Sequence, residues 1–218
     1  MQSVQSYIEL DESLFISKGS HRETYRHPQD ENMCLKVVIP GSLERRRSKN
    51  RKWYKRLRSL SKFDETNKEL PAYQEIERQG IQMTHIPKFY GMVDTNRGRG
   101  MLLELIQNED GTRARSLRDH LDQAKDINRY EKPLLELGQY LIESALVIRD
   151  FSVRDLLVKE FRDGHLKMYV VDGFGGHTMI PLNRIRIFAH AAARRRVRRF
   201  FRNIAQRYPG LSALETKL

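Results

Sequence analysis

Five ionisable residues stand, in order along the chain, in settings suited to phosphate chemistry. Lys36 lies inside an apolar run, and Glu69 lies in a following segment of helical pattern. Asp150 and Asp155 are five residues apart in VIRDFSVRDLLVKE, and Asp172 separates the apolar run MYVV from a glycine. Phosphoryl transfer uses a lysine to hold nucleotide phosphates and carboxylates to hold Mg²⁺ and to orient the acceptor. These residue types, in this order, predict such a site.

Each residue has an expected role in this chemistry. Lys36 is expected to hold the phosphates, with Glu69 orienting its ammonium group. Asp155 and Asp172 are the expected metal ligands, and Asp150 is expected to accept the proton of the acceptor hydroxyl or to orient it. The glycine after Asp172 fits this role, because glycine lets the backbone turn away sharply from a ligand.

The same residues also have structural interpretations, which the sequence leaves open. Lys36 fits a lysine that points from a strand into solvent. Asp172 fits an aspartate that caps a glycine turn, and Asp150 fits a helix N-cap or the partner of a nearby arginine. Glu69 has other glutamates close to it on the same predicted helix.

The elements that must position these residues change character at an acidic connector, residues 107 to 111. Before it, short apolar or alternating runs predict strands, with one helix at 67 to 81. After it, the pattern is mostly helical, with a long helix at 130 to 148 and a hairpin that turns at Asp163-Gly164. The chain is therefore predicted to be α+β, with a sheet-bearing N-lobe at 1-106 and a helical C-lobe at 107-218.

Several of these stretches resemble protein-kinase motifs. VIRDFSVRDLLV is similar to the catalytic loop, with Ile148 in place of the histidine, Asp150 as the aspartate and Asp155 in place of the asparagine. VVDGFGG resembles the metal-binding aspartate-phenylalanine-glycine site, with an additional Gly173 after Asp172. CLKVV resembles the strand of the phosphate-binding lysine. The resemblance implies ATP and Mg²⁺ as cofactors.

Two further stretches bear on nucleotide binding. MLLELIQNEDG is similar to the strand and hinge beside an adenine pocket, which makes Glu104 a cofactor-binding residue by resemblance. SKGSHRET stands where kinases have a glycine-rich loop, and Gly19 is its one glycine. Several glycines normally let backbone N–H groups approach phosphates closely. The hydroxyls of Ser17, Ser20 and Thr24, or the side chains of His21 and Arg22, are candidate substitutes.

From about residue 10 to about 205, the chain resembles the YrbL-like family of small bacterial proteins named for the PhoP regulatory network. Membership implies a minimal bilobal protein-kinase-like fold, with a β-rich N-lobe and a short helical C-lobe, but no particular substrate. Because the sequence after Asp172 is short, we expect a lobe that acts on a small molecule in preference to a protein. A pseudokinase is the alternative.

The charge of the chain indicates a second kind of partner. Lys and Arg total 40 against 28 Asp and Glu, for a net charge of +12, which attracts polyanions. Two segments, Arg45 to Arg47 and Arg194 to Arg199, concentrate this charge. An apolar stripe runs along the second segment and consists of Phe188, Ala192, Val197, Phe200, Ile204 and Tyr208. It predicts a docked helix with a solvated basic face, with contact to anionic lipid or another polyanion as the alternative.

The single cysteine, Cys34, lies in an apolar run and is expected to be a buried thiol. A lone cysteine forms no internal disulfide, which favours a cytoplasmic protein. No stretch approaches the roughly 18 apolar residues of a membrane span, so peripheral membrane attachment is the alternative location.

Three functions therefore fit the sequence. The first is an ATP-dependent phosphotransferase that acts on an unknown hydroxyl acceptor. The second is a non-catalytic, kinase-like module that binds nucleotide or regulates a partner. The third is a basic polyanion-binding protein, which has no specific nucleic-acid motif to support it.

Overall fold

The computed structural model describes residues 7–49, 59–64, 66–148, 151–173, 186–215 and 217. The chain divides into two compact units. The first consists of Met1–Leu70 and Lys88–Leu105, and the second of Pro71–Pro87 and Ile106–Leu218. Both units contain strands and helices, so the predicted α+β class is confirmed. Within the described residues, no helix is long and apolar enough to cross a membrane.

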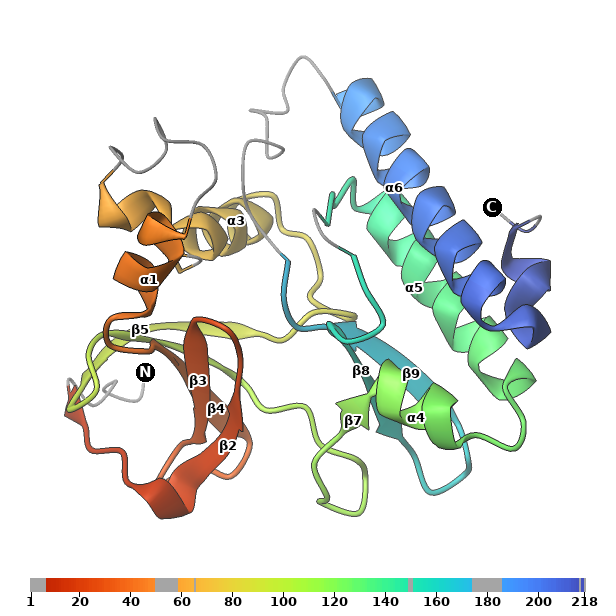
Figure 1. Ribbon diagram of the computed structural model, residues 1–218. Helices are drawn as coiled ribbons and strands as arrows, with labels where there is room; N and C mark the ends of the chain where they lie inside the picture. Colours follow the sequence, from red (N-terminus) through yellow and green to blue (C-terminus); the bar gives the residue numbers. More distant parts are fainter. Residues whose placement is uncertain are drawn as a thin grey trace. The chain divides into compact units, whose positions relative to one another are not determined.

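The first unit is built on a curled six-stranded sheet with the order β1-β5-β6-β4-β3-β2 (Figure 1). Its strands are β1 (Tyr7–Ile8), β2 (Phe15–Lys18), β3 (Arg22–Arg26), β4 (Met33–Val38), β5 (Phe89–Thr95) and β6 (Gly100–Glu104). β1 pairs parallel to β5, and the other pairs are antiparallel. One hydrophobic cluster in the core of this unit consists of Ile8, Leu10, Tyr25, Leu35, Val37, Val93 and Leu102.

The residues of strand β3 are mostly polar and show no apolar or alternating run in the sequence. In the structure Arg22–Arg26 lies between β2 and β4, with Tyr25 opposite Leu35. Backbone hydrogen bonds to both neighbours do not depend on side-chain polarity. The polar residues of this strand hide it because only Tyr25 carries an apolar signal, although Arg22 is buried as well.

Most described helical segments of the first unit are short, and α3 is the longest of them. They are the 3₁₀ turns η1 (Glu12–Leu14) and η2 (Leu60–Lys62), and the helices α1 (Ser42–Ser48) and α3 (Thr66–Arg78). The last helix, α3, begins in the first unit and continues into the second from Pro71. It ends before Gly80, which has a left-handed φ of 65°, as a helix-terminating glycine does.

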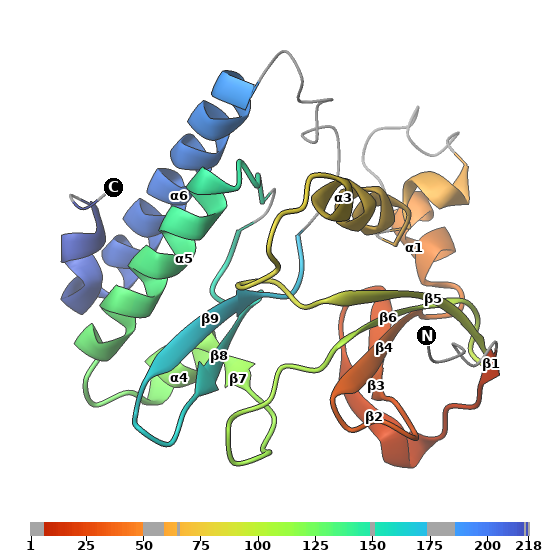
Figure 2. The same cartoon turned by 180° about the vertical axis from the view of Figure 1, so that it is seen from behind.

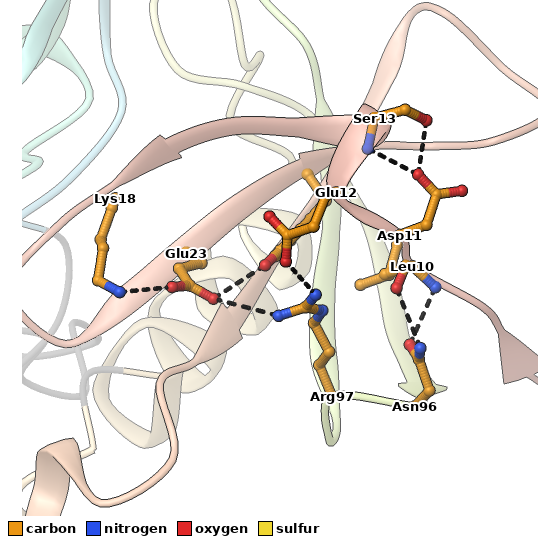
Figure 3. Close-up of polar contacts among 9 residues, drawn as sticks. Leu10, Asp11, Glu12, Ser13, Lys18, Glu23, Asn96 and Arg97 are labelled. Atoms are coloured by element: carbon orange, nitrogen blue, oxygen red, sulfur yellow. Dashed lines mark hydrogen bonds and ion pairs between the residues drawn. The ribbon is translucent and has the colours of Figure 1, made fainter.

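A polar cluster ties the turn between β5 and β6 to the chain after β1 (Figure 3). The Asn96 side chain accepts from the Leu10 backbone N–H at 2.9 Å and donates to its carbonyl at 3.0 Å. The Arg97 guanidinium donates to Glu12 Oε1 at 2.6 Å and lies 5.0 Å from the centre of the Tyr25 ring. Because these contacts hold the turn against the chain after β1, we assign the cluster a structural role and not a binding role.

The second unit contains a three-stranded antiparallel sheet, and helices cover it in layers. Its strands, in sheet order, are β7 (Arg115–Ser116), β8 (Leu156–Glu160) and β9 (Leu166–Val170). Its other helical segments are α4 (Leu117–Gln123), η3 (Asn128–Tyr130), α5 (Glu131–Glu143), α6 (Arg186–Arg207) and η4 (Pro209–Glu215). α5 packs on β9, and α6 runs alongside α5 (Figures 1 and 2). The predicted hairpin turn is present, with Gly164 at φ 82°.

The long helix predicted for 130 to 148 is wrong at its C-terminal end. α5 ends at Glu143, and Ala145 takes a left-handed φ of 52°. The Leu146 N–H then donates to the Leu141 carbonyl at 2.9 Å, which closes the helix end. Ile148 lies beyond the helix but is buried, at 2% exposed. The apolar spacing therefore continues past the end of the helix.

Helix α6 also differs from its sequence pattern. Most of the predicted stripe is at least partly buried, and the Phe200 ring stacks on Phe151 with centroids 3.9 Å apart. Phe188, however, is 70% exposed. Phe188 and Val197 are nine residues apart, which is two and a half turns of about 3.6 residues, so they lie on opposite faces. Phe201, which the predicted stripe left out, is 1% exposed and faces the core together with Phe200.

We expect Phe201→Ala to destabilise the protein by about 3–5 kcal/mol, because it removes a fully buried ring and leaves a cavity. The measurement is chemical denaturation followed by circular dichroism. Phe188→Ala is the matched control, with the same change on the same helix at an exposed position, and it should leave the transition unchanged. Equal effects of the two variants would contradict the packing of α6.

Candidate functional site

Lys36 lies in the interior of the first sheet. It is on β4, opposite Thr24 of β3 and Met101 of β6, and its side chain is half-buried. The predicted strand around Lys36 is therefore confirmed. Its role toward phosphates stays a prediction.

Glu69 forms a buried, two-point ion pair that sequence reasoning missed. Arg22 Nη1 lies 2.7 Å from Glu69 Oε2, and Arg22 Nη2 lies 2.9 Å from Oε1. Arg22 is 7% exposed and Glu69 is 1% exposed. Two parallel hydrogen bonds between a guanidinium and a carboxylate stabilise a pair of charges that is buried away from water. The pair joins β3 to the start of α3, while the predicted orientation of Lys36 by Glu69 stays a prediction.

Gly19 lies in the short turn between β2 and β3. Its N–H donates to the Arg22 carbonyl at 2.8 Å, which closes the turn. A Cβ atom at this position would lie 3.5 Å from that carbonyl oxygen, an ordinary contact. Sterics alone therefore do not require glycine here, and the tight turn is held by its backbone.

Glu104 ends β6 and is held by backbone groups. Its Oε2 accepts from the Lys88 N–H at 3.1 Å, and its own N–H donates to the Lys88 carbonyl at 2.9 Å. The Cys34 thiol donates to the Glu104 carbonyl at 3.8 Å. Cys34 is buried, as expected, and this burial raises the pKa of its thiol to about 11. Its microenvironment is that of an inert structural thiol.

The two predicted metal ligands of the second unit lie at the same end of one hairpin. Leu156 of β8 is opposite Val170 of β9, and the Val171 N–H donates to the Asp155 carbonyl at 2.9 Å. Asp155 therefore immediately precedes β8. Asp172 immediately follows Val171, whose N–H is bonded to the Asp155 carbonyl. Antiparallel pairing brings together two aspartates that are distant in the sequence.

Local hydrogen bonds orient both carboxylates. Asp155 Oδ2 accepts from the Ser152 hydroxyl at 2.8 Å, and the Asp155 N–H donates to the Ser152 carbonyl at 3.1 Å. Asp172 Oδ1 accepts from the Gly173 N–H at 2.8 Å, and Gly173 has a φ of 88°. This φ is the conformation for which glycine is suited. Sequence reasoning missed Ser152, although the spacing Ser-x-x-Asp is a local turn signal.

These two half-buried carboxylates fit Mg²⁺ in kind and number. Mg²⁺ is normally held by one or two carboxylates, with the remaining positions filled by water and substrate phosphates. The described residues contain no group of three or more His, Cys, Asp or Glu side chains that could hold a metal ion. Asp150, the predicted partner of the acceptor hydroxyl, lies outside the described residues.

A buried histidine in the second unit was not singled out by sequence reasoning. His120 is 5% exposed, and its Nδ1 lies 3.3 Å from the Tyr130 hydroxyl and 3.5 Å from Glu160 Oε1. Burial lowers the pKa of His120 despite the nearby glutamate. Its contacts link α4, η3 and β8, which is a structural role.

Comparison with known proteins places the chain in a family. Residues 8–209 match the family described as PhoP regulatory network protein YrbL. The chain belongs to this family. It is also 27% identical over 178 residues to the "Uncharacterized protein YrbL" of Escherichia coli (strain K12) and to the protein of the same name from Shigella flexneri. Each alignment covers 80% of this chain and 77% of the relative. The predicted family is therefore confirmed, and its association is with the PhoP regulatory network.

We expect Arg22→Met to destabilise the protein by about 3–5 kcal/mol, because it leaves the Glu69 carboxylate buried without this partner. The double variant Arg22→Met/Glu69→Met should be more stable than the single variant. Urea denaturation of wild type, both single variants and the double variant measures this coupling. Lys18→Met is the control, because it removes an exposed ion pair with Glu23 and should change the transition little.

We also expect the Cys34 thiol to react slowly in the folded protein. A pKa of about 11 keeps the thiol protonated at pH about 8, and the thiolate is the reactive form. Colour release from a thiol-specific disulfide reagent should be slow in buffer and rapid in concentrated guanidinium chloride. Equal rates in the two solvents would contradict the burial of Cys34.

Proposed function

We propose that this protein is an ATP-dependent phosphotransferase of protein-kinase-like fold that acts on a hydroxyl group of a small molecule. The observation that carries the proposal is the pairing of β8 with β9, which brings Asp155 and Asp172 to one end of a hairpin. Both residues were predicted as metal ligands from their resemblance to kinase motifs. Their proximity in the fold supports that prediction.

The proposed roles follow the chemistry of each side chain. Asp155 and Asp172 hold Mg²⁺, which when bound neutralises charge on the nucleotide phosphates. Lys36 holds the phosphates, and Glu69 orients it. Asp150 accepts the proton of the acceptor hydroxyl or orients that group for in-line attack. Gly19 and Glu104 are proposed to contact the nucleotide, on the strength of the motif resemblance.

Features of the first unit support the kinase-like part of the proposal. A lysine occupies the interior strand β4, and a buried glutamate occupies the first part of α3. Arg22 fixes the Glu69 carboxylate at two points and so acts as a positioning residue. A lysine on a central strand and a glutamate on the neighbouring helix are two parts of the kinase phosphate-holding apparatus.

A second candidate function is a non-catalytic module that binds nucleotide. The observation that favours it is the turn at Gly19, which is closed by its own backbone bond to Arg22. Such a turn offers fewer backbone N–H groups to phosphates than a loop with several glycines. This candidate keeps nucleotide binding and loses phosphoryl transfer.

We expect Mg²⁺-ATP to raise the melting temperature of the wild type and to have no such effect on Asp172→Ala. A ligand at about 100 times its Kd adds about 2.7 kcal/mol, which is a shift of several degrees for a chain of this size. Melting is followed by circular dichroism with ATP alone and with Mg²⁺-ATP. Asp163→Ala, at the turn of the same hairpin, is the control and should keep the full shift. No shift in the wild type at millimolar nucleotide would contradict both candidate functions.

Asp150→Asn separates the two candidates. A phosphotransferase should keep its Mg²⁺-ATP shift in this variant and lose most of its turnover, because binding does not need the proton acceptor. Turnover is measured as ADP released from ATP in the presence of small hydroxyl compounds. Wild-type protein that binds Mg²⁺-ATP but releases no more ADP than Asp150→Asn is the non-catalytic module.

A further inference from the structure

One face of α6 presents an exposed row of arginines. Arg195, Arg199 and Arg202 are all exposed. Residues spaced by four and three positions lie on the same side of a helix. We call these three residues the arginine stripe. None of the 22 residues of α6 is acidic, so the helix itself supplies no negative charge to offset the stripe.

The opposite face of α6 is fixed in the core of the second unit. Its buried residues are Ala189, Ala193, Val197, Phe200, Phe201, Ile204 and Ala205. The His190 ring hydrogen-bonds to the Ile142 carbonyl of α5 at 2.7 Å, and the Phe200 ring stacks on Phe151. The helix is therefore held in one rotation, and the arginine stripe is presented outward.

Some other surface arginines of this protein are paired with carboxylates, whereas Arg129 and Arg154 are exposed without such a pair among the described residues. Arg78 contacts Glu75 at 2.5 Å, and Arg118 contacts Asp122 at 3.3 Å. The members of the arginine stripe, in contrast, form no ion pair with any residue that the structure describes. A row of like charges without counter-charges creates a strong positive potential, and its natural ligand is a surface of anions.

An exposed aromatic residue continues the same row. Phe188 is 70% exposed and lies seven residues before Arg195, which is about two helical turns. Transfer of such an exposed phenyl ring from water to an apolar environment is favourable in free energy. Interfacial helices place aromatic and basic residues together at the boundary between headgroups and acyl chains.

We infer that this face of α6 binds the surface of a membrane rich in anionic phospholipid, with the arginine stripe on the phosphates and Phe188 inserted at the headgroup boundary. Arginine fits this ligand because its planar fork pairs with phosphate at two points. The exposed Phe188 beside the stripe favours a membrane over a duplex, because an interfacial helix places an aromatic ring at the headgroup boundary, whereas the phosphate backbone of a duplex offers no apolar layer for it.

The test is sedimentation of the full chain with vesicles of phosphatidylglycerol and phosphatidylcholine, against vesicles of phosphatidylcholine alone. Binding should require the anionic lipid and should weaken as salt rises. Arg195→Gln/Arg199→Gln/Arg202→Gln should lose roughly 100-fold in partition, at about fivefold per arginine. Lys125→Gln/Lys132→Gln/Arg162→Gln is the matched control. It removes the same charge from other exposed positions of the second unit, and it should keep most of the binding.

Equal losses in the two triple variants would overturn the inference, because net charge and not this face would then drive binding. Phe188→Ser tests the aromatic contact and should lower vesicle partition about tenfold without lowering affinity for duplex DNA. Stripe-dependent binding to DNA with no binding to anionic vesicles would also overturn the inference. Thermal melting of each variant verifies folding. Because no nucleotide is added, the result does not depend on the proposed phosphotransfer.

Discussion

The buried ion pair between Arg22 and Glu69 is the constraint on which the first unit depends. Two full charges lie almost out of water, and their two-point geometry helps to offset the desolvation cost. That geometry requires β3 in its observed register and α3 in its observed position. The same register pairs β3 with β4 and places Lys36 in the interior of the sheet. The pair thus connects a structural requirement to the element that carries the proposed phosphate-holding lysine.

In the second unit, the backbone ladder between β8 and β9 has the corresponding role. It places Asp155 and Asp172 at one end of a hairpin, where local bonds from Ser152 and Gly173 orient the carboxylates. The chain belongs to the family of PhoP regulatory network protein YrbL. Phosphoryl transfer remains our proposal, and it rests on the chemistry of these carboxylates and on their resemblance to kinase motifs.

Helix α6 has one face buried in the core and another exposed to solvent. Its aromatic side is buried against Phe151 and α5, while its arginine stripe faces outward beside the exposed Phe188. The sequence predicted a docked helix with a solvated basic face, and the docking is observed. The exposure of Phe188 places one aromatic residue on the basic side of the helix instead of the packed side, and this supports our inference that the face binds a membrane surface.

The sequence by itself determined the α+β class, the strand around Lys36 and the turn at Gly164, because these follow from local periodicity and turn chemistry. It determined the family through the resemblance of its motifs. Only the tertiary structure decided that Arg22 is the partner of Glu69 and that β3 exists, since ladder bonds and buried ion pairs join segments far apart in the chain. It also decided the end of α5 at the left-handed Ala145 and the outward side of Phe188. Apolar spacing reports burial, and burial alone does not specify helix length or rotation.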